Sequence, residues 1–243
     1  MSPVDRVAHL NRWRHRSLIE KAMLALGMLI LAVLLPPFPA AAVIAVIMTA
    51  AALLGARVPV SVWLACAAGP LGFLLSGAIS LVVQIDANGL ALAPGGLTAA
   101  AGLVARSVAA LTCLLFLALT TPATDLVAGL RRCGLPAEIA EMALLTYRFL
   151  FLLADTAMSM DAAQAARLGH VGARRRLSSL GSLIANLLPR AIDRARRLEI
   201  GLAARGWEGE MRVLTETRPI SIAGVTLVLA LEAGTAALGV VMS

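Results

Sequence analysis

The chain has 243 residues, of which 60% are hydrophobic and only 14% are charged, and its mean hydropathy is +0.87. A soluble domain of this length carries about a quarter charged residues, so the composition excludes an ordinary soluble protein and predicts several membrane crossings. The net charge of +7 is concentrated, since eleven of the 21 Lys and Arg lie between Arg167 and Arg218 and five between Arg6 and Lys21.

Basic runs beside apolar runs, with an aromatic content of only 4%, fit the positive-inside rule better than nucleic-acid binding. The cysteines form no CxxC pair, and no histidine stands at ligand spacing from another histidine, a cysteine or a carboxylate. We therefore predict buried thiols at Cys66 and Cys113, which lie in apolar runs, and no metal site or cofactor. The residues concerned are Cys66, Cys113, Cys133, His9, His15 and His170.

The apolar runs predict an all-α polytopic membrane protein with about five transmembrane helices and cytoplasmic amphipathic helices. Residues 1–18 are basic and polar and are expected to stay in the cytoplasm. Prolines and glycines separate the runs, because they end helices and form turns. The expected spans are 18–35, 40–56, 60–83, 97–120 and 220–242, with an outer loop at 84–96. The expected parts are a bundle of four spans (1–121), a cytoplasmic region (122–218) and a final span (219–243).

Two features of these spans invite interpretation. Small residues recur every fourth position in the third span, at Ala68, Gly72, Ser76 and Ser80, and such a stripe lets another helix approach closely. The partner is either a helix of this chain or a second membrane subunit. Arg106 is a lone cation within the fourth span, so it is expected to reach the interface or to pair inside the bundle.

The character of the chain changes after Thr121. A short amphipathic helix is expected to begin near Thr124 or Asp125, because these residues cap helices, and to end before 134–136. Residues 137–167 form one long helical pattern. Its apolar middle is short for a span, and a crossing there would place the densest basic cluster outside the cell, so we predict a partly buried helix.

A second amphipathic helix is predicted over 187–205, with its apolar and arginine faces separated. Asp193 stands four residues before Arg197, the favourable order for an ion pair. The run Arg174-Arg175-Arg176 is interpreted as a solvated loop facing lipid headgroups.

The two long helical patterns end alike, with Ala166-Arg167-Leu168-Gly169 in one and Ala204-Arg205-Gly206 in the other, and the two arginines are 38 residues apart. Arginine in a last turn with glycine just beyond is a common way for a helix to end. The repetition supports a second interpretation. Small neighbours let each arginine enter a groove on a partner and present its planar cation to a carboxylate or carbonyl.

Over roughly 95–209 the chain resembles the transmembrane T component of energy-coupling factor (ECF) transporters, in particular the cobalt-type, CbiQ-like branch. The first helix end departs from the family pattern, because its glycine comes one place late. The second fits. The resemblance rests on these two ends and on Thr120-Thr121-Pro122 with Asp125-Leu126, Gly134-Leu135-Pro136 and Tyr147-Arg148-Phe149.

The resemblance implies a non-catalytic scaffold in the bacterial inner membrane, with its N-terminus in the cytoplasm. Its helix ends would bind two cytosolic ATPase subunits, and its spans would hold a separate substrate-capture subunit. The absence of a GxxxxGK[ST] motif agrees with ATP hydrolysis elsewhere. The residues implied are Ala166, Arg167, Leu168, Ala204, Arg205 and Gly206 for the ATPases and Gly72, Ser76 and Ser80 for the membrane subunit.

Three alternatives stay open at this stage. The same scaffold serves nickel or a vitamin in related systems, and nothing in it identifies the substrate. An intramembrane phosphatidyltransferase also places Ala-Arg beside acids, and Asp161 lies six residues before Arg167, but that chemistry needs several carboxylates at fixed spacing to hold a divalent metal. A permease that moves a solute through its own bundle would need more polar groups than Gln84, Arg106 and Glu232.

Overall fold

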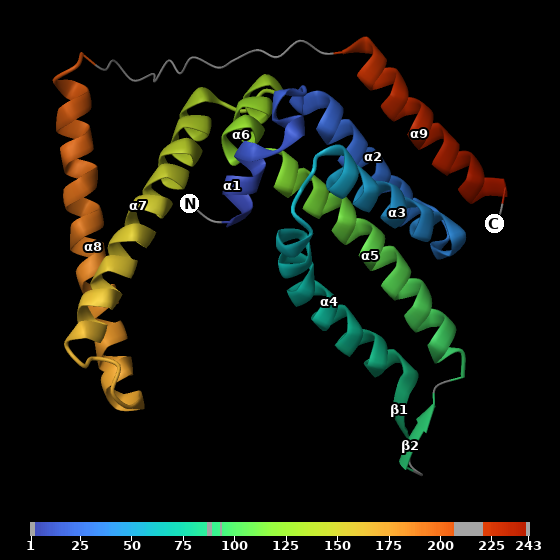
Figure 1. Cartoon of the computed structure of the whole chain (residues 1–243), viewed down its shortest axis with the longest axis horizontal. Coiled ribbons are helices and arrows are strands. Elements are labelled where there is room, and N and C mark those ends of the chain that lie inside the picture. The colour runs from blue at the N-terminus through green and yellow to red at the C-terminus, as the bar shows by residue number, and fades with distance from the viewer. Residues whose placement is uncertain (1–2, 87–88, 93, 207–220, 242–243) are drawn as a thin grey trace. The chain divides into compact units, whose positions relative to one another are not determined.

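The computed structural model describes residues 3–86, 89–92, 94–206 and 221–241 (Figure 1). The chain divides into two compact units. The bundle unit comprises Met1–Gly129 and Glu216–Ser243, and the hairpin unit comprises Leu130–Thr215. The helices are α1 (Pro3–Leu10), α2 (Leu18–Leu34), α3 (Ala42–Ala50), α4 (Val60–Val82), α5 (Gly96–Thr120), α6 (Ala123–Arg132), α7 (Ala137–Ala166), α8 (Ala173–Ala203) and α9 (Ile222–Val241).

Shorter elements join these helices. A 3-10 turn at Arg12–His15 follows α1, and two π turns flank α3. Two short strands, β1 (Val83–Asp86) and β2 (Gly89–Leu92), pair as an antiparallel hairpin. The π turns are Pro37–Ala41 and Ala51–Gly55.

Among the described residues, four helical stretches are long and apolar enough to cross a membrane: Pro37–Gly55, α4, α5 and α9, with 19, 23, 25 and 20 residues. The first predicted span, α2, has 17 residues and would extend about 26 Å, close to the ~30 Å hydrocarbon core. The predicted class, an all-α polytopic membrane protein, is confirmed. The long α7 is not among the four.

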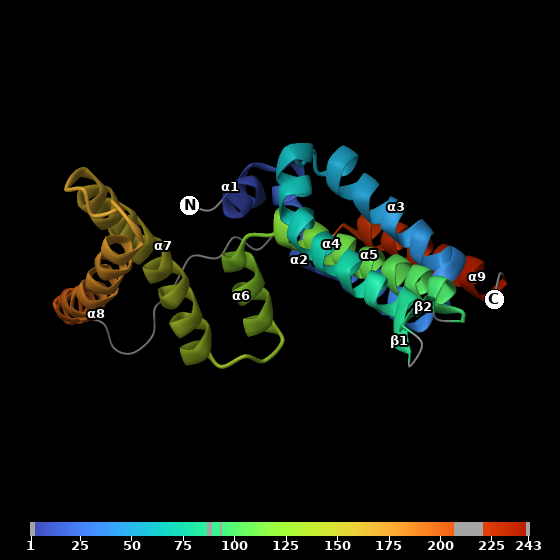
Figure 2. The same cartoon turned by 90° about the horizontal axis from the view of Figure 1, so that it is seen from below.

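Helix α5 is the centre of the bundle unit, since α1, α2, α3 and α4 all pack against it (Figure 2). Its buried face meets methionine and isoleucine side chains from α2 and α3, and Phe116 packs edge-on against Trp13 with 5.5 Å between ring centroids. Burial of such apolar side chains supplies the main stabilisation of this contact. The fully buried members of the core include Met28, Ile44, Met48, Cys113 and Phe116.

Helices α2 and α9 run side by side in the same direction. The carboxylate of Glu20 lies against Gly224 near the start of both helices, and Leu35 lies against Gly239 near their ends. In each pair the missing side chain of glycine leaves room for the neighbour, because a Cβ there would meet it at 2.7 Å. The start of α9 is therefore at the same end of the bundle as the start of α2.

The end of α5 and the loop before α4 lie at that same end. Lys21 donates a hydrogen bond from Nζ to the carbonyl of Thr120, with 3.0 Å between the atoms. The backbone N–H of Arg12 donates to the carbonyl of Ala56 at 3.2 Å. The basic N-terminal segment, the α3–α4 connection, the end of α5 and the start of α9 thus share one end of the bundle.

Three local expectations differ from the structure. Part of the expected outer loop is the β1–β2 hairpin, with Val83 opposite Leu92. Helix α8 begins at Ala173, fourteen residues before the predicted start, so the run Arg174–Arg176 is its first turn and not a loop. Pro189 lies inside this helix, in an exposed stretch.

The shared end of the bundle leads to a prediction of membrane topology. Single cysteines at Ser178 and Thr98, in a background without the native cysteines, should react with an impermeant maleimide from opposite sides of the membrane. Both positions are exposed, and Thr98 lies in the first turn of α5, at the end away from Lys21. Labelling of both from the same face of sealed vesicles would contradict this arrangement.

Candidate functional site

The first of the two repeated motifs ends helix α7. Arg167 is the residue at which the helix stops, and its N–H donates to the carbonyl of Gln164 at 3.1 Å. The N–H of Leu168 donates to Ala165 at 3.0 Å, and that of Gly169 to Gln164 at 2.9 Å. These bonds satisfy carbonyls that the end of a helix leaves without partners.

The second motif ends helix α8 with the same two backbone hydrogen bonds, each reaching back three residues. The N–H groups of Arg205 and Gly206 donate to Leu202 and Ala203, both at 3.0 Å. Gly206 has a left-handed backbone with φ of +70°, and Leu168, at the equivalent position of the first motif, has φ of +60°. The first motif departs from the second in sequence but shares these hydrogen bonds and the left-handed residue after the arginine. Leucine adopts a conformation there that normally favours glycine and costs other residues about 1–2 kcal/mol.

All six residues of the two motifs are exposed: Ala166, Arg167, Leu168, Ala204, Arg205 and Gly206. Neither arginine has an ion-pair partner within the part of the chain that the structure describes. Each cation stands at the negative end of a long helix, where it is stabilised. Arg167 precedes α8 and Arg205 follows it. The 31 residues of α8 separate them by about 46 Å, so one small ligand cannot contact both.

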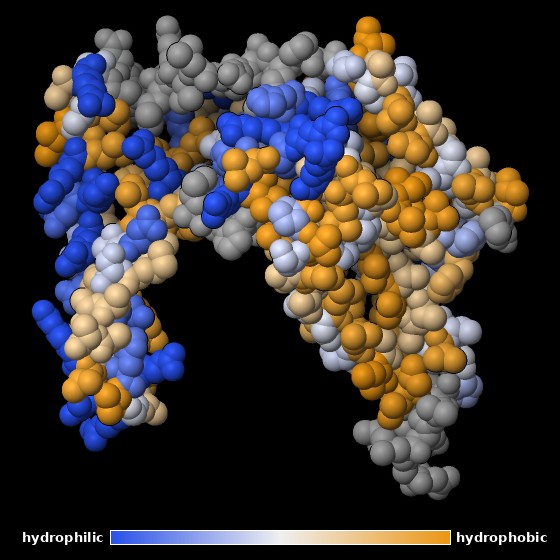
Figure 3. Space-filling view, in the orientation of Figure 1, coloured by the Kyte–Doolittle hydropathy of each residue, from blue (hydrophilic) through white to orange (hydrophobic). Residues whose placement is uncertain are grey.

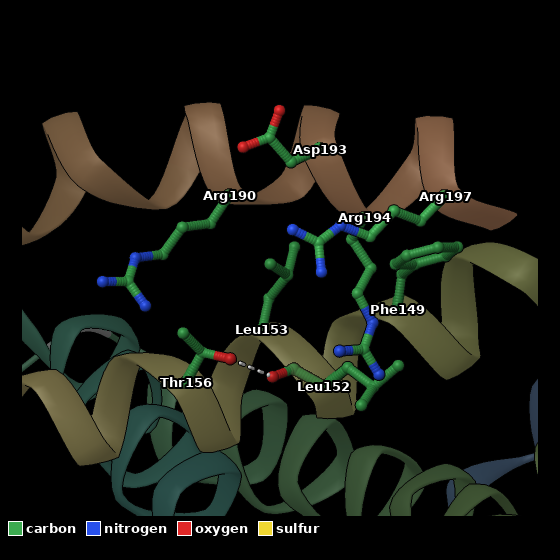
Figure 4. Close-up of a pocket in the computed structure, with 8 residues that line it drawn as sticks. All are labelled: Phe149, Leu152, Leu153, Thr156, Arg190, Asp193, Arg194 and Arg197. Carbon is green, nitrogen blue, oxygen red and sulfur yellow. Dashed lines mark hydrogen bonds between the residues drawn. The ribbon is translucent and has the colours of Figure 1, made fainter.

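A cleft of about 240 Å³ lies between α7 and α8 (Figure 4). Its two walls differ in chemistry, since α7 contributes apolar side chains and α8 contributes arginines. The hydroxyl of Thr156 is occupied, because it donates to the carbonyl of Leu152 at 2.8 Å. The lining residues are Phe149, Leu152, Leu153 and Thr156 from α7, and Arg190, Asp193, Arg194 and Arg197 from α8.

The arginines of this cleft extend from α8 on the side of α7, whereas the carboxylate of Asp193 points away (Figure 4). Asp193 makes no ion pair with Arg197 in the described residues, although the spacing of the two favours one. Hydrophilic residues gather over α8, in contrast to the hydrophobic surface over α4 and α5 (Figure 3). Planar guanidinium groups without carboxylate partners can hold an anionic group such as a carboxylate or a phosphate.

The small-residue stripe of α4 faces away from the other helices of the bundle unit. Gly72, Ser76 and Ser80 are exposed, and a Cβ placed on Gly72 would have no atom within 4 Å. Helix α4 packs on α5 through a different face, which also borders an open apolar groove of about 740 Å³ formed with α3 and α5. Packing within its own bundle therefore does not account for the stripe.

The lone cation Arg106 pairs inside the bundle, which was one of the two arrangements expected from the sequence. Its Nη2 donates to the carbonyl of Leu35 at 3.1 Å. The isolation of the histidines in sequence was misleading. His170 Nε2 lies 3.0 Å from Asp161 Oδ1, and His9 Nδ1 lies 3.5 Å from Asp5 Oδ1. Among the described residues, no three His, Cys, Asp or Glu side chains come together to form a metal site.

These features define a class: an integral membrane protein with a hairpin of two long helices that lies, in the sequence, between the membrane helices α5 and α9. This hairpin presents two exposed arginines. Residues 10–216 match the family described as cobalt transport protein, CbiQ. The chain is 54% identical over 242 residues to the cobalt transport protein CbiQ of Rhodobacter capsulatus, covering 100% of this chain and 99% of the relative.

Two further relatives agree. The chain is 31% identical to CbiQ of Salmonella typhimurium, covering 88% of this chain and 100% of the relative. It is 27% identical to a putative fused cobalt transport protein, CbiMQ, of Methanocorpusculum labreanum, covering 95% of this chain and 41% of the relative. The chain belongs to the CbiQ family and is a membrane component of cobalt transport.

The left-handed backbone of Leu168 generates a prediction about stability. Leu168→Gly should raise the free energy of unfolding by about 1 kcal/mol, because glycine adopts this conformation without a steric penalty. The side chain is 64% exposed, so its removal loses little packing. Leu168→Ala is the control, since it removes the side chain but keeps the penalty. Thermal unfolding followed by helical circular dichroism measures the effect, and equal melting temperatures for both variants would contradict it.

Proposed function

We propose that this chain is the transmembrane coupling subunit of an ECF-type importer for cobalt ion. In this role it transmits the ATP-driven motion of two cytosolic ATPase subunits to a separate membrane subunit that captures the substrate. The observation that carries the proposal is the pair of helix ends at Arg167 and Arg205, which share one backbone geometry and lie at opposite ends of α8.

Two equivalent helix ends suit two equivalent partners. Each end presents an exposed arginine beside an alanine, so a groove on an ATPase subunit has access to the whole guanidinium group. A separation of about 46 Å is too large for one groove but fits one groove on each of two subunits. The chain itself has no GxxxxGK[ST] motif, so the proposal assigns ATP hydrolysis to the partners and no catalytic step to this chain.

The proposed contact with the capture subunit is the exposed stripe at Gly72, Ser76 and Ser80. Small residues let a neighbouring helix approach closely in lipid, where packing and not water drives association. The stripe is available within the bundle unit, because α4 packs on α5 through another face. The relative in Methanocorpusculum labreanum, a putative fused cobalt transport protein CbiMQ, supports a membrane partner that lies next to this protein.

Orientation and substrate complete the proposal. The N-terminal segment at the shared end of the bundle carries Arg12, Arg14 and Arg16, and Arg57 follows in the α3–α4 connection. By the positive-inside rule we assign this end, and the N-terminus, to the cytoplasm of a bacterium. Cobalt is favoured over nickel or a vitamin because two relatives are named cobalt transport protein CbiQ.

The coupling role predicts that Arg205→Glu abolishes co-purification of the ATPase subunits and uptake of the substrate. A reversed charge in a groove that binds a cation loses a buried contact worth about 2–5 kcal/mol. Arg167→Glu should act in the same way at the other groove. Insertion into the membrane should be unaffected, because neither residue lies in a spanning helix.

Arg175→Glu is the matched control for these two variants. It makes the same change of charge on an exposed residue in the first turn of α8, where a surface charge contributes only about 0–1 kcal/mol. Wild-type levels of co-purified ATPase and of uptake in Arg205→Glu would show that this helix end is only a cap.

The proposal also predicts that the purified chain alone binds no cobalt or nickel tightly, since capture belongs to the separate subunit. Isothermal titration of the chain in detergent should show no stoichiometric site at micromolar concentrations of metal. Asp161 and His170 form the pair to examine first, because they place an imidazole and a carboxylate 3.0 Å apart. A stoichiometric site that disappears in His170→Gln would contradict this part of the proposal.

A further inference from the structure

The polypeptide passes between the bundle unit and the hairpin unit twice. On the first passage it runs on from Thr120, at the end of α5, and crosses the unit boundary after Gly129, and on the second it crosses the boundary at Glu216 and reaches Ser221, at the start of α9. The polypeptide carries a displacement of the hairpin unit to the membrane helices through these two passages. The last residue of α5, Thr120, and the residue before α9, Ser221, are bound by consecutive residues in the first turn of α2, Lys21 and Glu20.

Lys21 binds the passage that leaves the bundle. Its side chain is only 1% exposed, and Nζ donates to the carbonyl of Thr120 at 3.0 Å. Asn11 adds bonds from Nδ2 to the carbonyls of Leu119 and Thr120, at 3.3 and 3.2 Å. These are carbonyls that the end of α5 leaves without partners, and the negative end of the helix dipole favours the ammonium group.

Glu20 binds the passage that returns. Its side chain is buried, and Oε1 accepts a hydrogen bond from the N–H of Ser221 at 2.8 Å. Gly224 provides the space, because a Cβ at this position would lie 2.7 Å from Oε2. The guanidinium of Arg16 lies 4.0 Å from the same carboxylate. A carboxylate at the start of α9 is stabilised by the positive end of that helix dipole.

We propose that Glu20 and Lys21 form a clamp that delivers the displacement of the coupling hairpin to the membrane bundle. Adjacent residues of one helical turn cannot move apart, so a shift at either passage displaces α2. Helix α2 packs on both α5 and α9 and carries the shift across the bundle. Without the clamp, the hairpin moves on its two chain connections while the membrane helices stay in place. This inference rests on the proposed coupling function, and both residues act as positioning residues.

The test compares Lys21→Met with Arg106→Met in the complete complex, purified from native membrane with its ATPase and capture subunits. Both variants remove a buried or half-buried cation that donates to a carbonyl near a helix end. Arg106 does so for Leu35 at the opposite end of the bundle, at 3.1 Å. Lys21→Met should lower the number of cobalt ions imported per ATP hydrolysed roughly tenfold, as expected when a charged hydrogen bond is lost. Arg106→Met should keep the wild-type ratio.

The amount of co-purified ATPase should stay at the wild-type level in Lys21→Met, because the helix ends that bind it are unchanged. A purely structural role would lower assembled complex and uptake together and leave the ratio unchanged, which would overturn the inference. An equal fall of the ratio in Arg106→Met would also overturn it, because any lost intramembrane cation would then have the same effect.

A second pair of variants tests the other half of the clamp and does not depend on how well Lys21→Met folds. Glu20→Gln keeps an oxygen that accepts the Ser221 N–H and should retain the coupling ratio. Glu20→Met has no acceptor and should lose it. Equal ratios for these two variants would overturn the role of Glu20.

Amide hydrogen exchange separates a failed clamp from a failed coupling function, because it needs no ATPase. In the chain alone, Glu20→Met should speed exchange at the start of α9, and Glu20→Gln should not. If exchange changes as expected but Arg205→Glu still binds ATPase, the clamp exists and the proposed function is wrong. Unchanged exchange in Glu20→Met would overturn the clamp itself.

Discussion

The end of α5 sets the constraint on which the bundle depends. A helix that stops among buried atoms leaves carbonyl groups without partners, and each costs free energy unless a donor reaches it. Thr120 is fully buried, and the donors come from the N-terminal segment, through Asn11, and from α2, through Lys21. The polar start of this chain therefore folds over the central helix as a structural component of the bundle. The desolvation of Lys21 is offset by a carbonyl and by the helix dipole, which explains how an ammonium group is accommodated at 1% exposure.

This constraint also explains how a membrane bundle tolerates a long inserted region. Helices α2 and α9 start together, α5 ends beside them, and the chain leaves and returns at that same end. The contacts that fix these helices lie within the bundle unit, so the length and sequence of the hairpin unit are free to follow the needs of a partner. The arginine-rich helix α8 of the hairpin unit contributes little to a core. Leu183 is its buried residue, and its remaining side chains are exposed or half-buried.

The sequence alone predicted the helices whose signals are local. Long apolar runs bounded by Pro36, Pro59 and Gly95 gave the spans, and the repeated Ala-Arg endings gave the ends of α7 and α8 to within two residues. The start of α8 was misplaced because the run Arg174–Arg176 was interpreted as a loop, whereas it forms the first turn of the helix. Contacts between distant residues had no sequence signal. The pairing of His170 with Asp161, the burial of Lys21 on Thr120 and the outward stripe of α4 all depend on the tertiary arrangement. Consequently the exposed helix ends were predicted from sequence, but the buried junction was not.

The equivalence of the two helix ends is the clearest case in which conformation carries more information than residue identity. Leu168 has a large apolar side chain and Gly206 has none, yet both occupy the left-handed region that ends the helix. In both cases the preceding arginine is exposed. The glycine one place later, Gly169, closes the first end with a bond to Gln164 and lies against Ser179 of α8, where a Cβ would not fit. The glycine at position 169 permits this close approach, and Leu168 occupies the left-handed position before it. At the end of α7, the left-handed backbone of Leu168 costs free energy, and Gly169 lets the chain pass close to α8. At the end of α8 no such neighbour is found, because a Cβ on Gly206 would meet no atom within 4 Å among the described residues.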